Sequence, residues 1–305
     1  METVVLEKMP DLFWHLISEH RWNNFFLENI PENYPKAKIV IIRTKTIFDR
    51  SLFLNFPSLK LIIRAGSGFD NTNIEEATKR EILVFNTPEA NTQAAFEHTL
   101  SFIFALIKNH QYGKKAVIDG SWKDNIPMNL EISDLKILIV GVGRIGTKVA
   151  TTMKMLGAAV KGVDPYLSEE VRQKKAIEFV EYENGIRWCN MLSFHCPLTI
   201  ETENYFSLKT LNLFSQPIYI INTARGKILE EFAIKTGIND NKILGFAADV
   251  FPEEPWKKKK YAVNLNIYTT PHSASFTENA KNRLAYETIK VWAQYAFGAK
   301  QGFNI

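Results

Sequence analysis

The feature that most constrains the fold is a glycine-rich turn near the middle of the 305-residue chain. An apolar, strand-sized run over residues 135–140 leads into Gly141, Gly143 and Gly146, at the spacing Gly-x-Gly-x-x-Gly. A helix-forming stretch over residues 145–156 follows. The first glycine permits a tight turn, and the third lets the helix pack closely against the strand. Such a strand–turn–helix unit predicts a parallel sheet with helices on its faces.

Short apolar runs recur on both sides of this turn. They lie at residues 38–43, 59–63, 82–85, 158–163, 191–195, 217–222, 243–250 and 266–270. Buried parallel strands have this length and composition. Long helices are predicted over residues 92–109 and 277–297, and a polar surface segment over residues 113–129. The alternation predicts an α/β protein with two doubly wound parallel-sheet, Rossmann-like domains.

Composition narrows the class of protein. An apolar content of 46% and a charged content of 23% are typical of a soluble globular chain. Cys189 and Cys196 have no metal-ligand spacing and form no disulfide framework, so we expect no metal site and a cytoplasmic location. No run is long enough to span a membrane, and residues 1–10 do not resemble a signal peptide. The net charge of +4 is too small to indicate nucleic-acid binding, and the basic run at residues 257–260 is expected to be a solvated loop.

The glycine turn also predicts a cofactor. The middle glycine leaves room for a pyrophosphate, and the helix N-terminus offers unpaired N–H groups to it. Asp164 ends the next strand, 18 residues after Gly146, where a carboxylate binds the adenosine ribose hydroxyls and repels a 2′-phosphate. We therefore expect NAD rather than NADP. Arg144 and Ile145 complete the turn; Arg144 either contacts the pyrophosphate or is an ordinary surface arginine.

Three ionisable residues, each shortly after an apolar run, predict acid–base chemistry. Arg225 lies in Asn-Thr-Ala-Arg-Gly, Glu254 follows 29 positions later, and His272 follows 18 beyond that. A guanidinium can hold a carboxylate through two parallel N–H bonds. An imidazole can exchange a proton with a reacting oxygen, and a carboxylate can fix its tautomer. The spacing and the following proline favour Glu254 over Glu253 for this last role. With NAD, the set predicts hydride transfer on a 2-hydroxy or 2-oxo acid.

Several motifs together resemble those of one family. They are RAGSGFDN at residues 64–71, NTPEAN at 86–91, EHT at 97–99, the glycine turn, LSFHCPLT at 192–199, NTARG at 222–226, DVF at 249–251 and PH at 271–272. In this order they resemble the D-isomer-specific 2-hydroxyacid dehydrogenases, over nearly the whole chain. The resemblance implies a discontinuous substrate-binding domain, residues 1–91 and 275–305. It also implies an NAD-binding domain, residues 92–274, an active site in the cleft between them, and a homodimer.

The resemblance assigns further cofactor contacts. Thr223 and Ala224 are expected along the nicotinamide. Asp249 is expected to bond the carboxamide end of the cofactor or to orient the site from behind. His195 and Pro197 end the strand on which the adenine rests, and for His195 a structural role is an equal alternative.

Substrate contacts are expected near the N-terminal half. Ser67 and Gly68 are expected to offer backbone N–H groups to the substrate carboxylate. Arg43 begins Arg-Thr-Lys-Thr, which resembles the Arg-Ser-x-Thr stretch of 3-phosphoglycerate dehydrogenases, where the arginine meets the phosphate. Arg64 is similarly placed in that subgroup. Two guanidinium groups suit a dianionic substrate, although both arginines are alternatively plain solvated side chains.

We therefore expect an NAD-dependent 2-hydroxyacid dehydrogenase acting on 3-phosphoglycerate. A glycerate, glyoxylate or lactate enzyme of the family is the first alternative. A non-enzymatic NAD-sensing protein, like the C-terminal-binding corepressors, is the second. Formate dehydrogenases carry Gln where Glu254 stands, which argues against that group.

Overall fold

The computed structural model describes residues 1–124, 126–256 and 266–298, so the basic run at residues 257–260 lies outside the described part. The chain divides into two compact units, Met1–Ala94 with Ser275–Ile305 and Ala95–Ala274. The first boundary lies three residues after the expected one. Each unit is built on a parallel sheet, so the prediction of two parallel-sheet α/β domains is confirmed.

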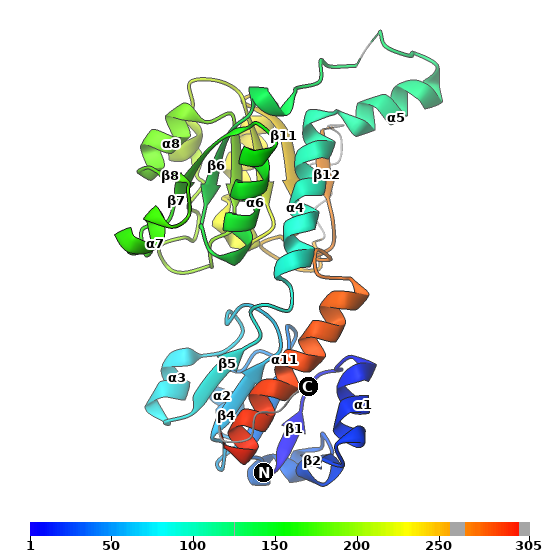
Figure 1. The fold of residues 1–305 in the computed structure, drawn as a ribbon, viewed down its shortest axis with the longest axis vertical. Coiled ribbons are helices and arrows are strands. Elements are labelled where there is room, and N and C mark those ends of the chain that lie inside the picture. Colours follow the sequence, from blue (N-terminus) through cyan, green and yellow to red (C-terminus); the bar gives the residue numbers. More distant parts are fainter. Residues whose placement is uncertain (125, 257–265, 299–305) are drawn as a thin grey trace. The chain divides into compact units, whose positions relative to one another are not determined.

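The first unit contains five parallel strands in the order β2-β1-β3-β4-β5. They are β1 (Thr3–Val5), β2 (Phe26–Leu27), β3 (Ile39–Ile42), β4 (Leu61–Arg64) and β5 (Leu83–Asn86). Helices α1 (Asp11–Glu19) and α11 (Glu278–Phe297) pack on one face, and α2 (Arg50–Phe53) and α3 (Ile74–Lys79) on the other (Figure 1). The sequence did not predict β1 and β2, because two or three residues are too few to show a period.

Side chains alternate along the strands of this unit and so supply both faces. Ile39 and Ile41 pack toward α1 and α11, whereas Val40 and Ile42 pack toward α2 and α3. Trp292 of α11 is fully buried, and its indole Nε1–H donates to Thr3 Oγ1 at 2.8 Å. This contact ties the C-terminal helix to the N-terminal strand, as a discontinuous domain requires.

The second unit contains seven parallel strands in the order β12-β11-β10-β9-β6-β7-β8. They are β6 (Lys136–Val140), β7 (Ala159–Val163), β8 (Glu178–Phe179), β9 (Met191–Phe194), β10 (Ile218–Asn222), β11 (Ile243–Ala248) and β12 (Ile267–Thr269). One face packs on α4 (Thr92–Ile107) and α6 (Arg144–Met155). The other packs on α8 (Tyr182–Trp188), α9 (Leu208–Leu211) and α10 (Glu231–Asn239), and α7 (Glu169–Gln173) follows β7. The order reverses between β6 and β9, where such sheets bind ligands.

An arm leaves the second unit after α4. The polar segment predicted over residues 113–129 is in part a helix, α5 (His110–Asp119), which ends at Gly120 with a left-handed φ of 74°. Gly113 lowers the helix propensity of this stretch, which concealed it in the sequence. In Figure 1, α5 leads away from the sheet of its own unit. Across the described ranges, no helix combines the length and apolarity needed to cross a membrane.

His195 locks the end of β9 against the neighbouring strand. Its backbone N–H donates to Val140 O at 2.7 Å, and its ring Nε2 lies 2.9 Å from Ser193 Oγ. Burial lowers the pKa of His195 from 6.5 to about 3. Between these two values the unfolded chain binds a proton that the folded chain does not, so stability falls as the pH falls through this window.

We predict that this histidine makes the protein acid-sensitive. With a pKa of 6.5 in the unfolded chain, acidification to pH 5 lowers the free energy of unfolding by at most about 2 kcal/mol. The loss is smaller than this limit because part of His195 still reaches solvent. Urea unfolding of the wild type and His195→Asn, each at pH 7.5 and pH 5, isolates this contribution. The wild type should lose more stability on acidification than the variant. Equal losses would show that His195 does not carry the effect.

Candidate active site

The three glycines of the turn after β6 serve different purposes. Gly141 has a φ of +90°, and a Cβ there would lie 2.4 Å from Cys196 N. A Cβ on Gly146 would lie 2.0 Å from Gly141 O, so both positions require glycine for packing. A Cβ on Gly143 would meet nothing within 4 Å. Gly143 is the N-cap residue of α6, and it has no side chain that could accept from the first N–H groups of the helix. Open space at the N-terminus of a helix fits a pyrophosphate.

Asp164 follows β7 and is tied to this turn. Its Oδ2 accepts from Val142 N at 2.9 Å, and its Oδ1 accepts from Tyr166 N at 3.2 Å. Arg172 Nη2 donates to the Asp164 carbonyl at 2.9 Å and fixes the backbone. A carboxylate retains lone pairs beyond these two bonds. Asp164 therefore fits the ribose of NAD. Of the other two residues of the turn, Arg144 is the first residue of α6, and Ile145 is partly buried against the core.

The structure also places the residues expected near the adenine and nicotinamide. His195 has the structural contacts described above, and Pro197 is exposed just beyond it. Thr223 Oγ1 lies 2.9 Å from Thr99 Oγ1 on α4, and Ala224 is buried after β10. Contact of these four residues with the cofactor remains a prediction.

The turn after β10 presents Arg225. Asn222 is buried and closes this turn, because its Nδ2 donates to Arg225 O at 2.9 Å and its Oδ1 accepts from Ala224 N at 3.0 Å. Arg225 Nη1 donates to Ala224 O at 2.7 Å. A Cβ on Gly226 would lie 1.9 Å from the carbonyl carbon of Phe251, so only glycine lets this turn approach the segment that leads to Glu254.

Glu254 and His272 come together across 18 residues of sequence. Glu254 Oε2 lies 2.7 Å from His272 Nδ1, and Glu254 Oε1 accepts from Phe251 N at 3.0 Å. Burial alone would raise the pKa of Glu254, but the hydrogen bonds from His272 and Phe251 and the charges of His272 and Arg225 outweigh it and lower the pKa. The three residues predicted to be catalytic thus lie on three loops of the second unit, and the charge of Arg225 reaches Glu254.

Asp249 holds the loop that carries His272. Its carboxylate is 1% exposed and accepts from Ser273 N at 2.8 Å, from Ala274 N at 2.9 Å and from the Thr270 hydroxyl. Its carbonyl accepts from His272 N at 2.7 Å. His272 has a φ of 52°, which costs a non-glycine residue energy and therefore needs such support. Of the two roles expected for Asp249, these contacts favour orientation of the site.

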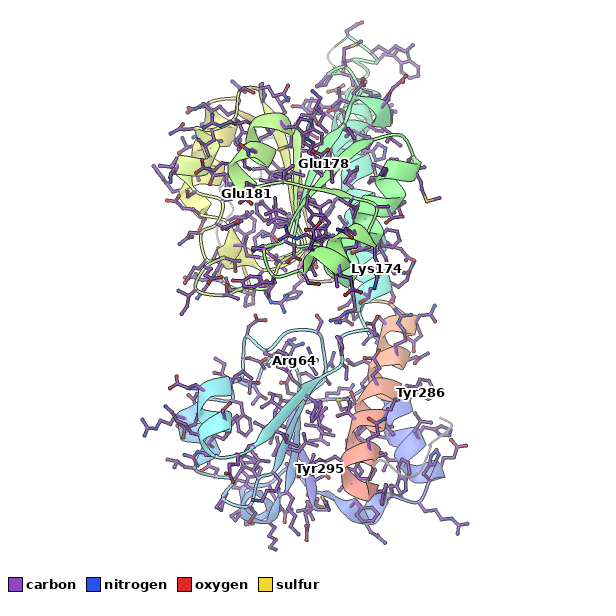
Figure 2. All side chains as sticks on the ribbon, turned by 60° about the vertical axis from the view of Figure 1, so that its left-hand side comes forward. Arg64, Lys174, Glu178, Glu181, Tyr286 and Tyr295 are labelled. Atoms are coloured by element: carbon purple, nitrogen blue, oxygen red, sulfur yellow. The ribbon has the colours of Figure 1, made fainter. Side chains whose placement is uncertain are left out.

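Apart from Arg225, the predicted substrate residues lie in the first unit. Arg64 is buried at the end of β4 (Figure 2), and its Nε donates to Asn71 Oδ1 at 3.4 Å. A Cβ on Gly66 would lie 1.9 Å from Arg64 Nη1, so the guanidinium covers this glycine. Asn86 Nδ2 donates to Ser67 O at 2.8 Å and holds the loop that continues into Gly68.

Glu7 organises the turn that begins at Arg43, and sequence reasoning missed it. Its carboxylate accepts from the backbone N–H groups of Arg43 at 2.8 Å, Thr46 at 2.9 Å and Lys45 at 3.1 Å. Arg43 Nη1 donates to Lys8 O at 2.8 Å, and its buried Nε has no hydrogen-bond partner among the described residues. Asn71 Nδ2 donates to the carbonyls of Arg43 and Thr46. Glu7 is 36 residues from the turn, so no local motif signalled it.

In the described part of the chain, no group of three or more histidine, cysteine, aspartate or glutamate side chains could hold a metal ion.

The nucleotide-binding features agree with the comparisons to known proteins. D-3-phosphoglycerate dehydrogenase of Bacillus subtilis is 30% identical over 280 residues, which are 90% of this chain and 53% of that protein. The chain thus spans about half the length of the curated relatives it matches.

Two solved structures share the fold. D-lactate dehydrogenase of Aquifex aeolicus, complexed with NAD and lactic acid, has a TM-score of 0.86 at 23% identity and covers 97% of this chain and 95% of its own. An acyclic imino acid reductase in complex with NADPH and D-Arg has a TM-score of 0.84 at 22% identity and covers 97% of both chains. The family described as "D-isomer specific 2-hydroxyacid dehydrogenase, NAD binding domain" matches residues 100–274, and the chain belongs to this family.

Proposed function

We propose that this protein transfers a hydride between NAD and a D-2-hydroxy or 2-oxo acid, with 3-phosphoglycerate as its substrate. The observation that carries the proposal is the Glu254–His272 pair beside Arg225. It supplies an acid–base group and a carboxylate-binding cation within one unit. The names of the curated relatives support the substrate.

Each side chain has a role in this proposal, which the geometry supports. Arg225 holds the substrate carboxylate through its planar guanidinium. Because His272 Nδ1 faces Glu254, His272 Nε2 is the nitrogen that exchanges a proton with the substrate 2-hydroxyl. NAD, held by the glycine turn after β6 and by Asp164, would supply the acceptor for the hydride that leaves carbon 2. Glu254 stabilises the imidazolium that forms when His272 takes the proton, as the lowered pKa of this carboxyl indicates.

We predict that His272→Ala lowers turnover by at least about 10²-fold, since general acid–base catalysis contributes roughly that much or more. NADH affinity should stay within about threefold, because His272 acts on the substrate. Steady-state kinetics and NADH fluorescence titration measure the two effects. His15→Ala, an exposed histidine on α1, is the matched control. Cofactor-dependent association without turnover of any 2-oxo acid would instead favour the non-enzymatic NAD-binding alternative.

The turn at residues 43–46 bears on the choice of substrate. Three of its backbone N–H groups are already bonded to Glu7, so an anion there has to be bound by side chains. Arg43 and exposed Lys45 supply two cations at this turn, and Arg64 supplies a third from β4. Cations of this number suit a substrate that carries a phosphate besides its carboxylate.

We predict that Arg43→Ala raises the KM for 3-phosphoglycerate about tenfold or more, because a hydrogen bond to a charged group contributes about 1.5–3 kcal/mol. The KM for glyoxylate, which has no phosphate, should change little. Arg50→Ala, on the exposed surface of α2, is the control. Initial rates with 3-phosphoglycerate, glycerate and lactate plus NAD, and with glyoxylate plus NADH, complete the test. Turnover without a preference for phosphate would refute this substrate and leave the family-level activity standing.

The arm that includes α5 is proposed to bind a second copy of the chain. Large apolar side chains of the arm are exposed to solvent: Ile118 is 75% exposed and Met128 is 91% exposed. Val117 and Trp122 are each 66% exposed. Several such side chains on one projecting segment are typical of an interface, because water contact with apolar surface is unfavourable. A symmetric dimer is the commonest assembly that covers such a surface.

We predict that Ile118→Glu shifts the protein from dimer to monomer, because it would bury a charge in the interface. Sedimentation equilibrium over a range of protein concentrations measures the shift. Ile200→Glu is the matched control, since Ile200 is 98% exposed on a turn of the same unit. An unchanged dimer, or a monomeric wild type, would contradict the proposed arm interface.

A cytoplasmic location is proposed on the basis of the thiols. Cys189 and Cys196 are buried and unpaired, and burial raises the pKa of each to about 12. Free thiols without a disulfide are typical of proteins from reducing compartments.

A further inference from the structure

The motif Glu97-His98-Thr99 on α4 is not used by the mechanism above, yet two of its side chains touch loops of the site. His98 Nε2 lies 2.9 Å from Thr270 Oγ1, and Thr99 Oγ1 lies 2.9 Å from Thr223 Oγ1. We infer that His98 is a positioning residue, which holds the His272 loop by donating a hydrogen bond to Thr270. The inference rests on the proposed function, because it concerns the same loop.

The direction of the hydrogen bonds follows from counting protons. The Thr270 hydroxyl has one proton, and it donates that proton to Asp249 Oδ1. Thr270 Oγ1 can therefore only accept from His98, so the His98 ring must carry its proton on Nε2. Burial lowers the pKa of His98 against the opposing charge of Asp249, which keeps the ring neutral and leaves it this one N–H. The chain of bonds thus runs from His98 through Thr270 to Asp249.

Asp249 transmits this constraint to the catalytic histidine. The same carboxylate accepts from the backbone N–H groups of Ser273 and Ala274, and the Asp249 carbonyl accepts from His272 N. Without the His98 donor, Thr270 can turn its hydroxyl away from Asp249. The buried carboxylate then loses one of three donors, and the segment that fixes His272 loses an anchor.

Thr99 makes an analogous contact with the Arg225 turn. Its hydroxyl donates to Ala95 O at 2.8 Å, so the proton between Thr99 and Thr223 comes from Thr223. Consecutive residues of α4 therefore accept from the loop after β10 and donate to the loop after β12. The helix sets both loops from one rigid element, which is the arrangement that precise positioning needs.

The test compares His98→Leu with His98→Gln. Leu removes the donor, whereas the Gln side chain can donate from its amide nitrogen. We expect His98→Leu to lower kcat about tenfold or more, with KM and NADH affinity within about threefold, because small displacements of a reacting group cost rate rather than binding. His98→Gln should recover most of the loss. His15→Leu, at an exposed position of α1 in the other unit, should behave as wild type.

A second measurement does not depend on activity. Amide hydrogen exchange of His272, Ser273 and Ala274 should become at least about tenfold faster in His98→Leu, and return toward the wild-type rate in His98→Gln. Unchanged exchange would overturn the inference even if the protein had no 2-hydroxyacid turnover. Equal losses of kcat in both variants, or a lower unfolding free energy without any change in kcat or exchange, would show a merely structural role. Altered exchange in a protein without turnover would refute the proposed function and retain the His98 contact.

Discussion

The site depends on one constraint, that all parallel strands of a sheet end at the same edge. In the second unit, the turns after β6, β7, β10 and β12 carry Gly143, Asp164, Arg225 and His272. Residues separated by more than a hundred positions therefore lie along one edge of the same sheet. The buried apolar strands determine this edge, since alternate side chains of each strand pack into the cores on the two faces. Folding of the sheet thus assembles the chemistry, and the loops only adjust it.

The adjustment is made by buried polar groups. Asp249 is a carboxylate with almost no exposure, and such a group is costly unless donors surround it. The Thr270 hydroxyl and two backbone N–H groups supply those donors. Because the donors come from the loop of His272, satisfying the charge also fixes this proposed catalytic histidine, including its left-handed backbone. The hydrogen bonds that stabilise the Asp249 carboxylate are therefore the same ones that position the proposed acid–base group.

Sequence reasoning succeeded where a residue type and a spacing had one physical explanation. The apolar runs gave most strands of both sheets, and spacing paired Glu254 with His272, whose side chains lie 2.7 Å apart. It failed for β1 and β2, which are too short to show a period, and for α5, whose weak propensity resembles a loop. It also missed Glu7, which bonds to a turn 36 residues away, because no local pattern announces a long-range contact. The sequence predicted the role of a side chain only where its partner was close in sequence or belonged to a recognisable motif.

Glu7 also shows why the fold alone does not specify a substrate. Proteins with nearly the same fold as this chain have been solved with lactic acid and with D-Arg, at 22–23% identity to it. In this chain three backbone N–H groups of the 43–46 turn are bonded to the carboxylate of Glu7, so they cannot distinguish between anions. The proposed discrimination between substrates therefore rests on side chains such as Arg43, which substitutions change without disturbing the sheet. NAD binding follows from the glycine turn and the edge of the sheet, whereas the proposed substrate depends on a few loop side chains.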